Sequence, residues 1–257
     1  MVRRCCHYLF SPLSRDTNSA HVPSHSVRSA LRTLCLRGCL ALLMITSATS
    51  AEEPAKTASP PTLETMSLFD GKTLTGWEVL DYAGTGGAEV KDGTLVLKQG
   101  EPITSIVWKG AKLPQLDYEL TMQARRVDGS DFFATVTFPV GKHYCSLVLG
   151  GWGGGVIGLS SINGADASEN ETTDYFDFEK NRWYKIRIRV TQTHLQAWID
   201  DKQVANINHT ENNLSVRIEM ELSKPLGLSS FHTTGEIRDI QLRRLTAKLD
   251  SQEQPSQ

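Results

Sequence analysis

Polar and apolar residues alternate through most of the body of the chain, and this pattern constrains the fold more than any other feature. Residues 184–190 (YKIRIRV) and 118–125 (YELTMQAR) carry apolar side chains at every second position. A period of two is typical of strands with one buried face. Asp92-Gly93 is a hairpin signal between two short runs. Further strands are expected over residues 131–138, 142–150, 195–199, 203–207, 226–231 and 236–245.

No segment shows a long helical period with caps, so the sequence predicts an all-β fold. Many short strands separated by turn signals are typical of a β-sandwich of two antiparallel sheets. No internal repeat is evident. The folded domain is expected to span residues 67–246.

The first 51 residues have the pattern of a signal peptide. Six arginines make this segment basic, residues 39–45 are apolar, and small residues lead up to Ala51. A basic region, a short apolar region and a small-residue cleavage site are typical of secretory signals. We therefore expect cleavage near Ala51 and export to the periplasm or the extracellular space.

The segments on either side of the domain are polar. Residues 52–66 are rich in Pro, Ala, Thr and Ser, which predicts a flexible linker. Residues 247–257 (AKLDSQEQPSQ) are expected to form a disordered tail. The uninterrupted apolar run of the signal is well short of the ~20 residues of a membrane-spanning helix. No transmembrane segment is expected after signal removal.

Charge and cysteine content exclude several classes of function. Removal of residues 1–51 leaves 21 Lys and Arg against 28 Asp and Glu, a net charge of −7. An acidic domain is a poor partner for nucleic acid or an anionic membrane. Cys145 is the one cysteine left, so an intrachain disulfide and a thiolate metal cluster are both excluded. Its apolar neighbours predict a small buried side chain in a strand.

Residues 68–77 (LFDGKTLTGW) open the domain with an apolar pair, an Asp-Gly turn, a polar run and Gly-Trp. Phe69 and Trp77 are expected to be core anchors on either side of that turn. This string resembles the opening signature of the bacterial 3-keto-disaccharide hydrolase domain, and the resemblance, to a divergent subgroup, continues to about Leu245. It implies a concanavalin A-like jelly roll with one concave face. It also implies hydrolysis or elimination at the glycosidic bond of a 3-keto sugar.

Five glycines surround one tryptophan in residues 150–155 (GGWGGG), which we call the glycine loop. Glycine permits close approach and positive φ. In one interpretation Trp152 stacks on a pyranose face while the N–H groups of Gly151 and Gly153 lie near sugar hydroxyls. In the other, the loop is a tight connection whose Trp closes the end of the sandwich.

Residues 164–178 (GADASENETTDYFDF), the acidic loop, are too polar for a core and too long for a simple hairpin turn. Long loops on a rigid sandwich often carry binding sites. Three interpretations remain open: a catalytic carboxylate, a structural calcium site built from hard oxygen ligands, or a solvated loop. The loop supplies Glu169 and Glu171 as acid or base candidates. Asp174, and Asn163 just before the loop, are candidates for substrate binding.

The chemistry that the resemblance implies needs a base near C2, a partner for the enolate oxygen and an acid near the leaving group. Asp131 and His143 complete the base and acid candidates, and Arg126 is a candidate for stabilising the enolate. His143 has a structural or solvated role as its alternative. No two histidines have metal-ligand spacing, so a zinc site is not expected. No cofactor is expected either, apart from the structural calcium considered for the acidic loop.

A function of another class is also open. The same jelly roll serves lectins and laminin-G domains, so the chain could be a non-catalytic carbohydrate-binding module, or a structural module of an exported assembly. A small carbohydrate is the expected partner of both the enzyme and the carbohydrate-binding module. An enzyme needs a carboxylate or histidine facing the pocket, whereas a lectin needs only aromatic and neutral hydrogen-bonding groups.

Overall fold

The computed structural model describes residues 64–246. The expected signal peptide, the expected tail and residues 52–63 of the expected linker lie outside the described residues. The elements are β1 (Thr65–Ser67), β2 (Trp77–Val79), β3 (Ala88–Lys91), β4 (Thr94–Leu97), β5 (Ile103–Trp108), β6 (Tyr118–Gly129), β7 (Thr135–Val140), β8 (His143–Gly151), β9 (Val156–Ser160), β10 (Asp174–Tyr175), β11 (Tyr184–Val190), β12 (His194–Ile199), β13 (Lys202–Asn208), the 3₁₀ helix η1 (Ile218–Ser223), β14 (Gly227–Phe231) and β15 (Thr233–Arg244).

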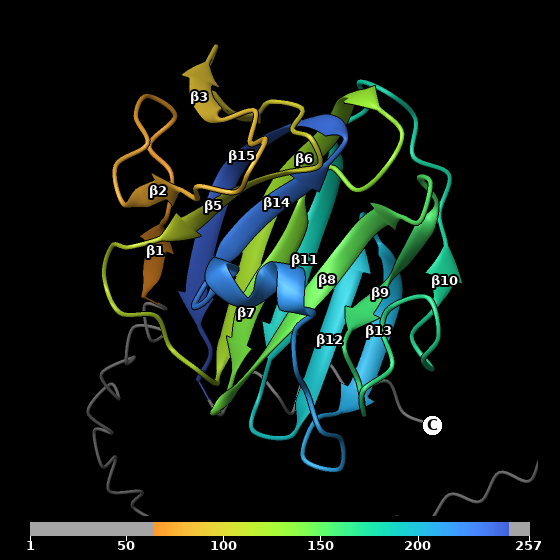
Figure 1. The fold of residues 1–257 in the computed structure, drawn as a ribbon. Coiled ribbons are helices and arrows are strands. Elements are labelled where there is room, and N and C mark those ends of the chain that lie inside the picture. The colour runs from red at the N-terminus through yellow and green to blue at the C-terminus, as the bar shows by residue number, and fades with distance from the viewer. Residues whose placement is uncertain (1–63, 247–257) are drawn as a thin grey trace, which may run out of the picture. The chain divides into compact units, whose positions relative to one another are not determined.

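Within residues 64–246 the strands form two antiparallel sheets that face each other (Figure 1). One sheet has the order β13-β12-β11-β6-β15-β4-β3, with β1 paired to β15. The other has the order β10-β9-β8-β7-β14-β5-β2. This arrangement confirms the predicted all-β class and the concanavalin A-like jelly roll. No helix among the described residues is long and apolar enough to cross a membrane.

The core lies between the sheets and follows from the alternation of side chains along each strand. On β11, Ile186 and Ile188 are buried, while Lys185, the second residue of the strand, is exposed. Cys145, in β8, is fully buried, as its apolar neighbours predicted. Burial raises the pKa of the Cys145 thiol to about 12.

The opening segment packs as the sequence predicted. Trp77 and Phe69 are both 8% exposed and belong to the core. The Trp77 ring meets Trp108 edge to face, with ring centroids 5.3 Å apart, and its Nε1–H donates to the carbonyl of Leu68 at 2.7 Å. The carboxylate of Asp70 accepts the N–H groups of residues 72 and 73 and so closes the turn between the two aromatic residues.

One boundary differs from the prediction, and two strands were not predicted. β1 begins at Thr65, inside the expected 52–66 linker, because Thr65–Ser67 pairs with residues 241–243 of β15. β5 and β9 were not predicted, since every residue of each is buried and neither shows exposed polar positions. The expected hairpin at Asp92-Gly93 is confirmed: both residues have positive φ, and Lys91 pairs directly with Thr94, as a type I′ turn requires.

The outer face of the seven-stranded sheet is partly covered. The short helix η1 lies across this face, against β5 and β14 (Figure 1). The segment carrying η1, the glycine loop and the end of β6 therefore surround one region of the outer face. That region holds the candidate site.

Candidate functional site

A cavity of about 240 Å³ lies on the outer face of the seven-stranded sheet. Its floor comes from five strands: Ile103 of β5, Thr135 of β7, Ser146 and Val148 of β8, Ser160 of β9 and Phe231 of β14. Its walls and rim come from two loops and the η1 segment: Asp131 and Phe132, Trp152, and Arg217, Glu219 and Met220. We call this cavity the outer-face pocket.

The strand period explains why these residues reach the pocket. Along β8, Ser146 and Val148 point outward while Cys145, Leu147 and Leu149 point into the core. The floor therefore consists of the outward-pointing residues of neighbouring strands. The inward-pointing residues of the same strands lie in the core, so the floor of the pocket is anchored there.

The helix η1 is tied to the sheet by buried hydroxyl groups. The Oγ of Ser223 lies 3.0 Å from the Oγ of Ser105, which lies 2.8 Å from the Oγ of Ser229. The hydroxyl of Tyr82 donates to the carbonyl of Glu219 at 2.5 Å. These contacts fix the wall that carries Met220 and Glu219.

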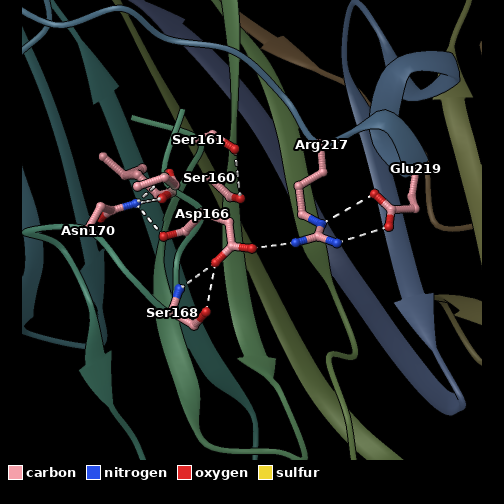
Figure 2. A network of polar contacts seen from close by, with 9 residues as sticks. Ser160, Ser161, Asp166, Ser168, Asn170, Arg217 and Glu219 are labelled. Carbon is pink, nitrogen blue, oxygen red and sulfur yellow. Dashed lines mark hydrogen bonds and ion pairs between the residues drawn. The ribbon is translucent and has the colours of Figure 1, made fainter. Parts of the chain in front are cut away.

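Arg217 joins the η1 segment to the acidic loop (Figure 2). Its Nη2 donates to Glu219 Oε1 at 3.0 Å and its Nε to Glu219 Oε2 at 3.3 Å. Its Nη1 donates to the carboxylate of Asp166. Asp166 also accepts the N–H and the hydroxyl of Ser168, at 3.1 and 2.7 Å. One guanidinium thus bridges two carboxylates that lie 53 positions apart in the chain.

These contacts shift the ionisation of the three groups. The hydrogen bond from Arg217 lowers the pKa of Glu219, and Glu219 in turn raises the pKa of Arg217. Burial opposes ionisation of Asp166, but hydrogen bonds from Ser168 and the charge of Arg217 outweigh it, so the pKa of Asp166 is also lowered. All three side chains are charged near neutral pH.

The glycine loop packs directly on a buried arginine. Arg126 is 6% exposed, and its Nη2 donates to the carbonyls of Gly154 and Gly150, at 2.8 and 3.3 Å. A Cβ at Gly150 would lie 2.3 Å from that Nη2, and a Cβ at Gly154 would lie 2.5 Å from the carbonyl oxygen of Ser130. Close approach to Arg126 and to the end of β6 therefore explains two glycines of the loop.

Asp131 holds the same loop from the pocket side. Its Oδ2 accepts the N–H of Gly153 at 2.9 Å and its Oδ1 accepts the N–H of Phe132 at 2.8 Å. Trp152, next to Gly153, is 46% exposed and has a positive φ of 49°. The Arg217 guanidinium lies 5.8 Å from its ring centroid. The loop thus places a partly exposed indole at the pocket rim, with Arg217 over one face of the ring.

The structure brings some of the predicted residues together. Asp131 and Trp152 line the outer-face pocket, and Gly151 and Gly153 flank the indole. Arg126 does not line the pocket, because it lies beneath the glycine loop between Phe133 and Phe178. Burial lowers the pKa of Arg126, and Asp131 acts in the opposite direction.

Other predicted residues lie away from the pocket. His143 begins β8, whereas Gly151 ends it, roughly 26 Å further along the strand. Glu169 and Glu171 are exposed on the acidic loop and do not line the pocket. Asp174 pairs with Lys202 at 2.6 Å, which lowers its pKa. Asn163 is bound to Asn212 and to the N–H of Asn213.

Most residues of the pocket were not identified from the sequence, among them the polar residues Thr135, Arg217 and Glu219. Thr135 belongs to a predicted strand, so the alternation of side chains along that strand could have indicated that it points outward. Arg217 and Glu219 precede or begin a short 3₁₀ helix with no strong sequence signal. Their position on the outer face depends on contacts with residues distant in the sequence.

The acidic loop is organised mainly by Asn170. Its amide Nδ2 donates to the carbonyls of Leu159 and Asp166, both at 2.7 Å, and its Oδ1 accepts the N–H and hydroxyl of Thr172. In residues 64–246 no group of three His, Cys, Asp or Glu side chains is placed to hold a metal ion. The loop's Asp166 and Asp174 face Arg217 and Lys202.

Comparisons with known proteins give one family match. A search of curated proteins found no match. Among solved structures, the chain is similar to the carbohydrate binding module CBM66 from Bacillus subtilis, with 12% identity and a TM-score of 0.41 over 65% of this chain and 95% of that one. It is similar to the Crh5 transglycosylase in complex with NAG, with 12% identity and a TM-score of 0.47 over 72% and 84%. It is also similar to a prokaryotic β-1,3-1,4-glucanase (lichenase) derived from a mouse hindgut metagenome, with 10% identity and a TM-score of 0.47 over 72% and 100%.

The family model that matches describes a 3-keto-alpha-glucoside-1,2-lyase-like domain, and it covers residues 64–243. That range includes every strand from β1 to β14 and nearly all of β15. The match supports a carbohydrate-related function. The chain belongs to the 3-keto-alpha-glucoside-1,2-lyase-like domain family.

Proposed function

We propose that this domain, as an exported protein, cleaves the glycosidic bond of 3-keto-glucosides by elimination across C1 and C2, at the outer-face pocket. The observation that carries the proposal is the convergence of a carboxylate, a guanidinium and an exposed indole on one cavity: Asp131, Arg217 and Trp152. Membership of the 3-keto-alpha-glucoside-1,2-lyase-like domain family supports the choice of this substrate class.

The reaction needs no external oxidant or reductant. The ketone at C3 acidifies the C2 proton, which a base removes to leave an enolate. The enolate then re-forms the ketone as a C1=C2 double bond forms and the C1–O bond breaks. The departing oxygen takes up a proton, so the products are an alcohol and a 1,2-unsaturated 3-keto sugar. Addition of water across the double bond would complete a net hydrolysis.

Asp131 is the carboxylate best suited to the role of base. Each of its oxygens accepts one backbone N–H, which fixes its orientation and leaves lone pairs for a C2 proton. Glu219 is less suited, because its hydrogen bonds with Arg217 lower its pKa and weaken it as a base.

Arg217 takes the role that the sequence analysis gave to Arg126. Its contacts with Glu219 and Asp166 use three of its five N–H donors, so two remain for the oxygen on which negative charge develops. The two carboxylates hold the guanidinium in place before substrate arrives. Trp152 at the rim offers a stacking face for the sugar ring.

A carbohydrate-binding module is the second candidate. The observation that favours it is the 46% exposure of Trp152 beside the pocket, because an open indole is sufficient to bind a sugar without chemistry. This function requires no base. It predicts that oxidised and unoxidised glucosides bind with similar affinity.

The test is a direct comparison of a methyl 3-keto-α-glucoside with methyl α-glucoside. The proposed enzyme releases methanol from the first and forms the conjugated ketone, which absorbs in the near ultraviolet, and it leaves the second intact. Binding of both compounds without release of methanol would instead favour the binding module.

A further inference from the structure

We infer that the interior of the outer-face pocket binds an apolar, ring-sized leaving group with a single polar atom, and that the Thr135 hydroxyl is the partner of that atom. The inference rests on the proposed elimination and names its substrate class: 3-keto-glucosides whose aglycone is a phenol rather than a second sugar.

The walls of the pocket are too apolar for a sugar ring to enter completely. Phe132 and Phe231 pack together on one side, with ring centroids 5.5 Å apart. Ile103, Val148 and Met220 complete the apolar lining. A sugar carries a hydroxyl on most of its carbons, and each buried hydroxyl without a partner would oppose binding.

The charged groups lie at the rim, where a sugar would find partners. The side chains of Arg217 and Glu219 are 42% and 41% exposed, and Trp152 is exposed beside them. The sugar therefore fits the rim, with C1 and C2 near Asp131 and Arg217, while the group attached to C1 extends into the apolar interior.

Thr135 is the hydroxyl of the floor that lacks a partner. Its Oγ1 is buried and makes no hydrogen bond. The other floor hydroxyls are paired: Ser146 with Thr137 at 2.9 Å, and Ser160 with Ser161 at 3.5 Å. A buried polar group without a partner calls for an explanation. Because this oxygen is closed to solvent, a rotation of the Thr135 side chain about χ1 would bring it to a hydroxyl or ether oxygen of a bound aglycone.

The volume agrees with a single ring. An apolar cavity of about 150 Å³ in another protein holds benzene, and the outer-face pocket has about 240 Å³. Phenol therefore fits within this volume and has one polar atom. Toluene has nearly the same shape and no polar atom, so the pair isolates the contribution of Thr135.

The test is an NMR titration of the domain with phenol and with toluene, following the Trp152 indole N–H and the Met220 methyl group. Wild type is expected to bind phenol about 10-fold more tightly than toluene, as one buried hydrogen bond allows. Thr135→Val should abolish that preference and Thr135→Ser should restore it. Ser230→Ala is the matched control, because Ser230 Oγ is also buried without a partner but does not line the pocket. This control should bind as wild type does.

Equal affinities for phenol and toluene in wild type, absence of binding, or an unchanged preference in Thr135→Val would overturn the inference. A second measurement separates it from the proposed reaction: the kcat/KM of phenyl and methyl 3-keto-glucosides. A higher value for the phenyl compound that falls in Thr135→Val supports the inference. Equal values would refute the aglycone assignment while leaving the elimination intact. Absence of turnover with both compounds, together with selective binding of phenol, would refute the elimination and leave the apolar site.

Discussion

The carboxylate of Asp131 accepts the backbone N–H of Gly153 at 2.9 Å, and this bond fixes the loop that carries Trp152. Asp131 follows the end of β6, whereas Gly153 follows the end of β8, so the contact joins two strands of different sheets at the pocket rim. A group proposed as the base therefore also orients the proposed stacking surface. An Asn at position 131 would retain an acceptor oxygen for Gly153 and remove the charge.

The glycine loop offers a test of its packing on Arg126. Gly150→Ala is expected to cost about 2–4 kcal/mol of unfolding free energy, because the new Cβ combines a positive φ with a clash against Arg126. Gly153→Ala, the control, also has a positive φ but nothing within 4 Å of its Cβ, so about 1 kcal/mol is expected. Urea unfolding of both variants checks the order. Equal losses would show that Arg126 moves aside without cost.

Trp77 is buried and Trp152 is exposed, so the two residues should differ in their contribution to the free energy of unfolding. Trp77→Ala is expected to cost about 3–5 kcal/mol, because it empties a buried site and removes the bond to the Leu68 carbonyl. Trp152→Ala removes an exposed side chain, and a change under about 1 kcal/mol is expected. Thermal unfolding of the two variants provides the comparison. A Trp77→Ala protein that melts within a degree or two of wild type would contradict the role of this residue in the core.

Acid should weaken the Arg217 network. The pKa values of Glu219 and Asp166 are lowered in the folded protein. Their ionised forms therefore contribute stability that is fully present above the ordinary carboxyl pKa, about 4, and is lost as the pH falls through the lowered values. The melting temperature of wild type should fall below about pH 4, and that of Arg217→Met should fall less steeply. Parallel curves for the two proteins would exclude this network as a source of the pH dependence.

Alternation of polar and apolar residues predicted strands such as β11, whereas β5 and β9, in which every residue is buried, were missed. β11 has the bounds expected from its alternation, Tyr184–Val190. β5 escaped prediction because one face packs in the core and η1 lies against the other, so its residues do not alternate in polarity. Burial on both faces is a property of the assembled fold and leaves no period of two in the sequence.

Only part of the candidate site was predicted, because contacts between residues distant in the sequence place the rest of it. Asp131 and Trp152 were identified from their loops, and both line the pocket. Arg217 was missed because its position depends on Asp166, 51 residues earlier in the chain. The glycines were recognised as sites of close approach, but their partner, Arg126, could be identified only once β6 and β8 were placed.

The most direct test of the proposed reaction is the exchange of the C2 proton of a methyl 3-keto-α-glucoside in deuterated water, followed by NMR. Wild type should remove this proton and release methanol. Asp131→Asn, which keeps an acceptor for Gly153, should lower both rates by about 100-fold or more, as expected for loss of a general base. Glu171→Gln changes an exposed carboxylate outside the pocket and is expected to match wild type. Full activity in Asp131→Asn, or loss of activity in Glu171→Gln alone, would contradict the assignment of the reaction to the outer-face pocket.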